Sequence, residues 1–200
     1  LSWYQTLREN LAQRGLHWRY NASVGAGLPI NFALADLQNS GDKITRIEGV
    51  FSGTLSWLCS SYDGSKAFSD LVLEAQALGF TEPDPREDLS GRDMQRKLLI
   101  LARELGIELE LGDISLSALM PDELSAGSWN DFVDNKASLD TFIKQHFEAA
   151  LQQNAALCYT GLLEFKNSKL NAKVGISYVP KNEAVANLTP GDNIFVINTQ

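Results

Sequence analysis

Apolar residues recur at helical spacing in several segments of this 200-residue chain. The clearest stripe consists of Phe68, Leu71, Val72, Ala75 and Leu78. Gly79 follows it directly, and because glycine commonly ends helices, we expect the helix to stop there. Residues 98–102 are apolar at every position, which predicts a helix buried on all sides. Similar patterns predict helices over 2–15, 30–37 and 137–154.

The helix that contains the run 98–102 is expected to start near Gly91 and to end at Gly106. Ser90 stands three residues before Asp93, which is the spacing of a capping box. In that motif, two side chains satisfy the first free N–H groups of a helix. The predicted start therefore places Asp93 in the first helical turn.

Other segments have the composition of β-strands. Residues 156–165 and 169–179 flank the tripeptide KNS and predict a β-hairpin. Residues 43–52 and 193–199 predict two more strands, and residues 17–24 predict a further extended run. Helical and strand patterns alternate without an internal repeat. We therefore expect an α/β (α+β) fold in which helices cover one face of a mixed sheet.

Composition limits the classes of partner. The chain is 44% hydrophobic and carries a formal net charge of −8, which argues against nucleic acid and anionic membranes as partners. No apolar run approaches the roughly 20 residues that span a bilayer, and the first residues lack the features of a secretory signal. Cys59 and Cys158 lie in apolar sequence and are expected to be buried free thiols. These features favour a cytoplasmic protein that binds small molecules or other proteins.

The segment EPDPREDLSGRDMQRKLL joins a rigid acidic loop to the start of the buried helix. Pro83 and Pro85 force the residues before them into extended geometry, so the carboxylate of Glu82 is oriented before a cation arrives. Asp93 and Lys97 are four residues apart on one helix face, and the apolar run behind them places the lysine at the edge of the core. An amine there can transfer protons, although the same spacing also fits an ordinary surface ion pair.

The stretch GAGLPI at 25–30 is the nearest approach to the GxGxxG fingerprint of dinucleotide-binding folds. It has isoleucine at the position of the third glycine. This departure favours a turn that brings the backbone close to another group over a pyrophosphate cradle. His17 and His146 have no spaced partner, which argues against a metal site at either histidine.

Three strings stand in the order and at the separation found in homoserine dehydrogenases: YNASVGAGLPI at 20–30, GVFSGTLSWL at 49–58 and EPDPREDLSGRDMQRKLLILARE at 82–104. The chain resembles this family throughout, and most of all the bifunctional aspartokinase/homoserine dehydrogenases of the methionine branch. The resemblance implies interconversion of L-homoserine and L-aspartate 4-semialdehyde with NAD or NADP, in a homodimeric cytoplasmic enzyme. It also implies fusion to an aspartokinase, and a subunit contact on the uncovered sheet face or on a sheet edge.

The resemblance assigns roles to individual residues. It places Lys97 as the proton-transfer residue and Glu82 as the carboxylate that holds the substrate ammonium. Around the same substrate it places Gly53, Thr54, Phe80, Glu87 and Asp93. The chain departs from the family at two of these positions: many relatives have aspartate at Glu87 and tyrosine at Phe80, so one hydroxyl donor is lost.

By the same resemblance, backbone carbonyls of Val24, Ala26 and Leu28 bind a monovalent cation, typically sodium. The family's nucleotide fingerprint precedes the matched region, and its ribose-reading residues, which distinguish NAD from NADP, lie there too. We therefore expect residues 1–24 to be the last helix and strand of a nucleotide-binding domain, and residues 25–200 to be a substrate-binding and dimerisation domain. The chain is expected to be a fragment that is inactive alone.

Two alternatives remain open from the residues. A noncatalytic amino-acid-binding or dimerisation module would use Glu82, Asp93 and Lys97 to hold an amino acid without redox chemistry. A Schiff-base lyase would use Lys97 as a nucleophile.

Overall fold

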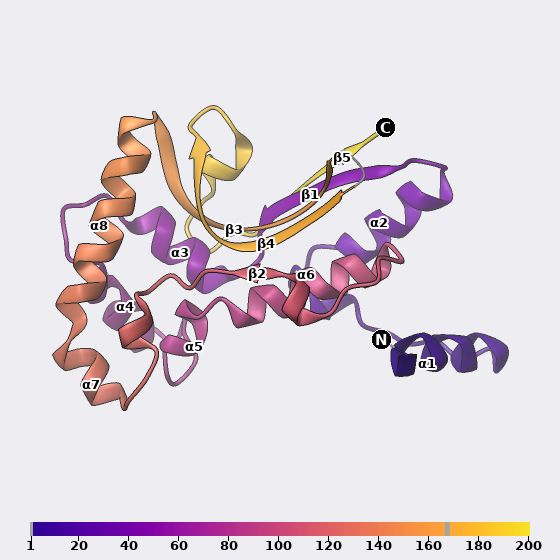
Figure 1. Ribbon diagram of the computed structural model, residues 1–200, viewed down its shortest axis with the longest axis horizontal. Coiled ribbons are helices and arrows are strands. Elements are labelled where there is room, and N and C mark those ends of the chain that lie inside the picture. Colours follow the sequence, from indigo (N-terminus) through magenta and orange to yellow (C-terminus); the bar gives the residue numbers. More distant parts are fainter. Residues whose placement is uncertain (1, 167–168) are drawn as a thin grey trace.

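The computed structural model describes residues 2–166 and 169–200 and contains one five-stranded sheet in the order β2-β4-β3-β1-β5 (Figure 1). The antiparallel neighbours are β1 with β3, β1 with β5 and β3 with β4, whereas β2 runs parallel to β4. The predicted mixed sheet is thus confirmed. The strands are β1 (Ile44–Val50), β2 (Ser115–Leu116), β3 (Ala155–Lys166), β4 (Lys169–Pro180) and β5 (Ile194–Thr199).

The predicted hairpin is confirmed by twelve antiparallel residue pairs that join β3 to β4 and end at Lys166 opposite Lys169. Asn167 and Ser168 of the KNS tripeptide lie outside the described residues. Because β1 inserts between β3 and β5, the centre of the sheet is built from segments more than 100 residues apart in the sequence.

Helices α3, α6 and α8 pack on β3 from the same side of the sheet (Figure 1). The α-helices are α1 (Ser2–Gln13), α2 (Ile30–Asn39), α3 (Gly53–Ser61), α4 (Phe68–Ala77), α5 (Arg86–Leu89), α6 (Arg92–Glu104), α7 (Trp129–Asp134) and α8 (Lys136–Gln152). Short 3-10 helices are η1 (Asn21–Ser23), η2 (Leu111–Asp113), η3 (Asp122–Leu124) and η4 (Ala184–Asn187). None of the helices in the described ranges combines the length and apolar character needed to cross a bilayer.

The end of α4 agrees with the sequence. Gly79 has a φ of +75°, and the main-chain N–H of Phe80 donates to the carbonyl of Ala75 at 2.9 Å. This is the bonding pattern of a helix terminated by a left-handed glycine.

The start of α6 is right, but the predicted capping box is wrong. Gly91, with a φ of +70°, is the N-cap residue of α6 and has no side chain to cap it, although the N–H of Arg92 donates to the Ser90 hydroxyl at 3.3 Å. The unpredicted helix α5 occupies the acidic loop, and Ser90 stands at its end, where its hydroxyl donates to the carbonyl of Glu87 at 2.6 Å. Ser90 therefore bonds to the end of α5 and to the first residue of α6, and it does not form the reciprocal pair with Asp93.

The main core lies between the sheet and the helices on this side. Leu98, Leu101 and Ala102 of α6 are fully buried, as predicted, but Ile100 is only half-buried, so one side of the helix reaches the surface. Each fully buried leucine contributes about 1.5–3 kcal/mol of hydrophobic stabilisation. Cys59 and Cys158 are both buried and free, as predicted.

The other face of the sheet is only partly covered. Val185 of η4 packs there on Val50, Cys158 and Val179. Elsewhere this face carries Arg46, which pairs with Glu48 of its own strand and with Glu164 of β3. One end of the face is therefore apolar and covered, and the other end carries charged side chains.

The strand predicted over residues 17–24 is wrong. Residues 16–20 have no regular structure, and η1 follows them, because no strand in the described ranges lies beside this segment to pair with it. The segment packs through Trp18 and Tyr20 instead, and α1 stands away from the sheet (Figure 1). The division into domains at residue 24 stays a prediction.

Candidate active site

The amine of Lys97 is held between two oxygen acceptors. Its Nζ lies 2.7 Å from Oδ2 of Asp93, so the predicted pair between successive turns of α6 forms. Nζ also donates to the main-chain carbonyl of Phe51, at the end of β1, at 3.1 Å. The Lys97 side chain is 24% exposed, whereas that of Asp93 is 61% exposed. The contact with the sheet distinguishes this pair from a purely surface ion pair.

The acidic loop before α6 is braced by its own residues. Gln76 of α4 donates to the carbonyl of Pro83 at 3.0 Å. Arg86 donates through Nε to the carboxylate of Asp84 at 2.9 Å and through Nη1 to the carbonyl of Gly127 at 2.9 Å. These bonds fix the direction of the loop on both sides of its prolines.

The carboxylate of Glu82 is exposed and accepts no hydrogen bond or ion pair from the described part of the chain. Its main-chain N–H, in contrast, donates to Oδ2 of Asp88 at 2.8 Å. The backbone at this position is therefore held while the charged group stays free for a ligand.

Asp88 is a residue of this site that sequence reasoning missed. Burial raises the pKa of Asp88, while the bond from the Glu82 N–H and the nearby Thr54 hydroxyl act in the opposite direction. Thr54 donates its one hydroxyl hydrogen to the carbonyl of Phe80 at 2.6 Å. In the sequence, Asp88 appears only as a second acidic residue next to Glu87 in the EPDPRED string. The sequence does not show which of two adjacent acidic side chains turns inward.

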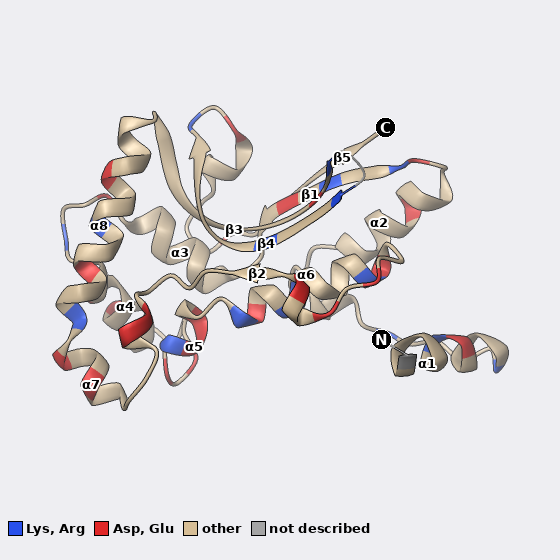
Figure 2. Cartoon of the chain, viewed as in Figure 1, with Lys and Arg blue, Asp and Glu red and all other residues tan. Residues whose placement is uncertain are grey.

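A hollow of about 400 Å³ lies over α5 and the first turns of α6. Acidic and basic residues follow one another along these elements (Figure 2). Its lining includes the predicted residues Glu82, Glu87 and Asp93, together with Asp84, Arg86, Asp88, Ser90, Arg92, Arg96, Met120 and Ser125.

The other predicted residues are not in the wall of this hollow, although Lys97 and Thr54 each interact with a residue that is. Lys97 reaches it through Asp93. Thr54 lies beside Asp88 and donates to the carbonyl of Phe80. Gly53 is the first residue of α3, whose N-terminus is capped by Ser52.

The glycine turn at 25–30 has an unusual backbone. Gly25 and Ala26 have φ values of +81° and +52°, and the N–H of Leu28 donates to the carbonyl of Gly25 at 2.9 Å. The group that approaches the backbone here is the ring of Phe195 in β5, because a Cβ added to Gly25 would lie 3.0 Å from its Cε2 atom. The space beside Gly25 is thus filled by protein, whereas that beside Gly27 is open. The buried Ile30 at the third position and the irregular residues 16–20, where the fingerprint needs a strand, do not match a dinucleotide-binding turn.

The predicted cation ligands differ in availability. The Leu28 carbonyl already accepts a bond from the N–H of Ile30 at 2.9 Å, whereas no main-chain bond within the described ranges uses the carbonyls of Val24 and Ala26. Near the same turn, Oδ1 of Asn31 is buried without a partner in the described chain. Neutral oxygen atoms of this kind suit a hard cation. The cation site stays a prediction.

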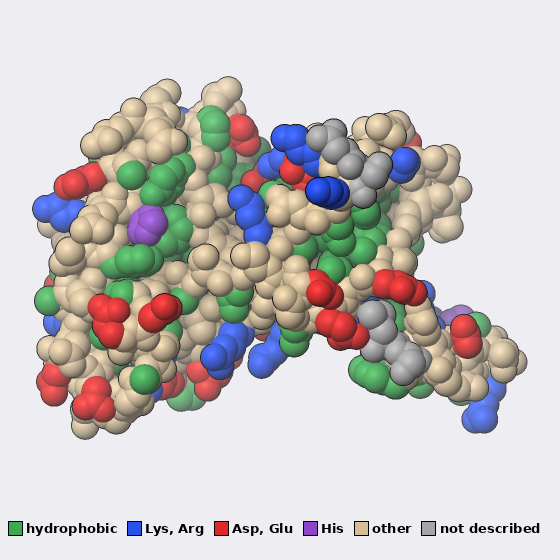
Figure 3. All heavy atoms as spheres, in the orientation of Figure 1, with side chains coloured by type: hydrophobic (Ala, Val, Ile, Leu, Met, Phe, Trp, Pro, Cys, Tyr) green, Lys and Arg blue, Asp and Glu red, His purple; other side chains and the backbone are tan. Residues whose placement is uncertain are grey.

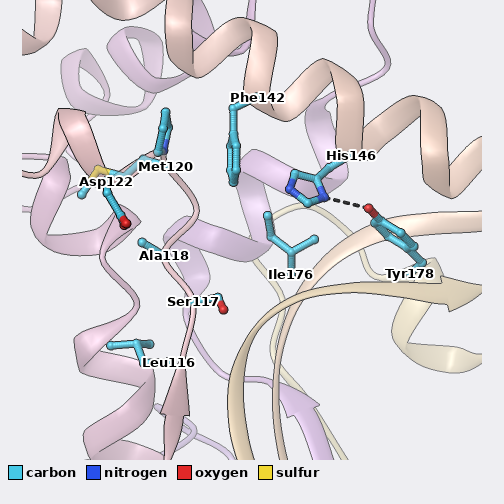
Figure 4. Close-up of a pocket in the computed structure, with 10 residues that line it drawn as sticks. Leu116, Ser117, Ala118, Met120, Asp122, Phe142, His146, Ile176 and Tyr178 are labelled. Carbon is cyan, nitrogen blue, oxygen red and sulfur yellow. Dashed lines mark hydrogen bonds between the residues drawn. The ribbon is translucent and has the colours of Figure 1, made fainter.

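A second hollow, of about 690 Å³, lies beside α8 and holds none of the residues predicted for the site (Figure 4). His146 and Tyr178 meet on its wall, with Nδ1 2.7 Å from Oη, and burial lowers the pKa of His146. Hydrophobic side chains gather on the surface of this part of the molecule (Figure 3).

Comparison with known proteins places this arrangement in one family. The model of the homoserine dehydrogenase family matches residues 29–200. Bifunctional aspartokinase/homoserine dehydrogenase 2 of Escherichia coli K12 is 44% identical over 197 residues, covering 98% of this chain and 24% of that protein. Homoserine dehydrogenase of Emericella nidulans is 38% identical over 192 residues, covering 90% of this chain and 52% of that protein.

Solved structures of other proteins share the fold of this chain. A Candida auris protein of unknown function superposes with a TM-score of 0.82 at 38% identity, over 90% of this chain and 51% of that one. A homoserine dehydrogenase from Thiobacillus denitrificans shares the fold with a TM-score of 0.77 at 22% identity, over 99% of this chain and 42% of that one. The chain thus spans about a quarter to a half of its relatives' length, and it belongs to the homoserine dehydrogenase family.

Proposed function

We propose that the protein containing this chain interconverts L-homoserine and L-aspartate 4-semialdehyde with NAD or NADP, and that this chain supplies the substrate-binding side of the site. The observation that carries the proposal is the amine of Lys97, fixed between Asp93 and the Phe51 carbonyl beside a hollow of alternating charge. The family match supports it independently.

Oxidation of the alcohol removes two groups: a hydride leaves the carbon and a proton leaves the oxygen. The nicotinamide, when bound, accepts the hydride. Lys97 in its neutral form accepts the proton of the hydroxyl, and it returns a proton to the aldehyde oxygen in the reverse direction. The two contacts of Nζ leave its third bonding direction for the substrate oxygen.

Homoserine is a zwitterion, and the hollow offers groups of both signs. The free carboxylate of Glu82 pairs with the substrate ammonium, with Asp88 close behind it. Arg92 and Arg96 line the same hollow and suit the substrate carboxylate. Opposite charges at two ends orient the hydroxyl carbon within the site.

Several properties of the whole protein belong to the same proposal. The glycine turn does not match the dinucleotide fingerprint, so we assign the dinucleotide to a separate nucleotide-binding domain of which residues 1–24 are the last part. Val24 and Ala26 contribute carbonyls to a sodium site, with Leu28 a weaker candidate because its carbonyl is already engaged. The partly covered sheet face is proposed as the homodimer contact. Fusion to an aspartokinase, as in the bifunctional relatives, and a cytoplasmic location complete the proposal.

The test is the Lys97→Met substitution in the full-length protein, with homoserine-dependent reduction of NAD⁺ or NADP⁺ as the assay. Loss of a proton-transfer group lowers kcat by about 10²–10⁴-fold. The matched control is Lys136→Met. Lys136 lies on α8, away from Lys97, and pairs with Asp70 of α4 at 2.9 Å, so this variant should keep full activity. Undiminished turnover in Lys97→Met would remove Lys97 from its role.

The two alternatives give different results in the same assays. A noncatalytic amino-acid-binding module would bind homoserine in the full-length protein without turnover. A Schiff-base lyase would form an adduct on Lys97 that borohydride traps.

A further inference from the structure

We propose that Phe51 is a positioning residue for Lys97: its main-chain carbonyl fixes the place of the amine, and its buried ring, held by Gly161 and Phe195, fixes that carbonyl. The inference rests on the proposed function of Lys97. It adds that the packing around Phe51, next to the sheet, sets the geometry in which Lys97 transfers a proton.

The two acceptors of the Lys97 amine differ in rigidity. Asp93 is 61% exposed on the surface of α6, so its carboxylate can move with the solvent. Phe51 is 0% exposed, and it directly follows β1 and directly precedes Ser52, the cap of α3. Because the Phe51 carbonyl is fixed between a strand and a helix, it determines the position of the Lys97 amine that bonds to it.

The ring of Phe51 is locked on one side by an aromatic stack. It lies parallel to the ring of Phe195, with centroids 5.2 Å apart and an interplanar angle of 9°. Phe195 belongs to β5, which pairs with β1 at Gly49. Phe195 also rests on Gly25, so the stack joins the glycine turn to the residue that contacts Lys97.

On the other side, the ring depends on a glycine. Gly161 of β3 lies directly opposite Gly49 of β1 in the sheet. A Cβ added to Gly161 would lie 2.3 Å from Cζ of Phe51 and 2.9 Å from its Cε1. Even one methyl group at Gly161 must therefore displace the phenyl ring. Because the ring is fully buried and stacked on Phe195, it has little free space to turn into, and the displacement strains the backbone that carries the carbonyl.

Three variants of the full-length protein test the inference: Gly161→Ala, Phe51→Leu and the double variant. The alanine methyl pushes the ring, whereas leucine at 51 lacks the Cζ and Cε atoms that the methyl would strike. A displacement on the order of 1 Å can cost about 10²-fold in rate. We expect Gly161→Ala to lower kcat for homoserine oxidation by about 10–100-fold while KM stays within about threefold. The double variant should return kcat to within about threefold of Phe51→Leu.

Phe195→Leu provides a test that introduces no clash, in case Gly161→Ala does not fold. It removes the stack and should lower kcat more than it changes KM. Phe68→Leu is the control, because Phe68 is equally buried in the same core but contacts Tyr62 and not the Lys97 network. It should lower the unfolding temperature and leave kcat unchanged.

The inference is overturned if Gly161→Ala folds and keeps its kcat, or if the double variant regains thermal stability without regaining kcat. It is also overturned if Phe195→Leu loses no more activity than Phe68→Leu. The proposed function fails separately, if the wild-type protein does not oxidise homoserine or if Lys97→Met stays active. An inactive Lys97→Met beside a fully active Gly161→Ala would reject the positioning role alone.

Discussion

The main-chain N–H of Glu82 donates to the carboxylate of Asp88 at 2.8 Å, which folds the acidic loop back on itself. The bond joins the residue with the free carboxylate to a carboxylate turned inward. Burial raises the pKa of Asp88, so the carboxyl group of Asp88 holds its proton more tightly in the folded protein than in the unfolded chain. That contribution to stability is fully present below the ordinary aspartate pKa of about 3.9, and it is lost as the pH rises through the raised value.

The first prediction concerns this loss of stability with rising pH. Asp88→Asn removes the ionisation but keeps an oxygen that can accept the Glu82 N–H, so the variant should gain unfolding temperature relative to wild type as the pH rises from about 4 to 7. Thermal unfolding of both full-length proteins across this range measures the difference. Glu87→Gln changes the exposed neighbour and should show a much smaller trend. If the wild type instead became more stable relative to the Asp88→Asn variant as the pH rose, the assignment would be contradicted.

The second prediction compares two glycines in the left-handed region. Gly91 and Gly106 have φ values of +70° and +74°, but a Cβ at Gly91 would lie 1.9 Å from Oη of Tyr159, while nothing lies within 4 Å of one at Gly106. Gly106→Ala should therefore cost only the backbone term of about 1–2 kcal/mol. Gly91→Ala should cost clearly more. Chemical denaturation of the two variants gives both values, and equal costs would show that Tyr159 moves aside freely.

Much of the fold could be predicted because helix stripes and helix stops are local. The stripe before Gly79 and the apolar run 98–102 correctly gave α4 and α6. The strand predicted over 17–24 failed for a nonlocal reason, since a strand needs a neighbour and the described chain places none beside this segment. Propensity alone does not show whether such a neighbour exists.

The site was predicted in the same uneven way. The spacing of Asp93 and Lys97 was sufficient to predict their ion pair, which the structure contains. The bond from Lys97 to Phe51, 46 residues earlier, could not be predicted, because a main-chain carbonyl has no signature in sequence. Asp88 was missed because the direction of a side chain in a loop depends on the bonds that close the loop.

The last prediction concerns the carboxylate of Glu104, which anchors the N-terminal segment to α6. It accepts from the hydroxyl of Tyr20 at 2.6 Å and from that of Tyr4 at 3.1 Å, and its side chain is only 10% exposed. Burial raises the pKa of Tyr20 to about 12, so this hydroxyl stays a donor at neutral pH. A hydrogen bond to a charged group contributes about 1.5–3 kcal/mol.

Tyr20→Phe removes the shorter of these bonds and leaves a buried carboxylate short of one donor. We expect the amides of α1 and of residues 16–24 to exchange their hydrogens faster in the full-length variant, while exchange in the β3–β4 hairpin stays unchanged. Mass spectrometry of peptides from both regions measures this. Tyr178→Phe is the matched control, because Tyr178 bonds to His146 on the other side of the molecule. Unchanged exchange in α1 after Tyr20→Phe would mean that Tyr4 and Arg8 hold the segment to Glu104 without it.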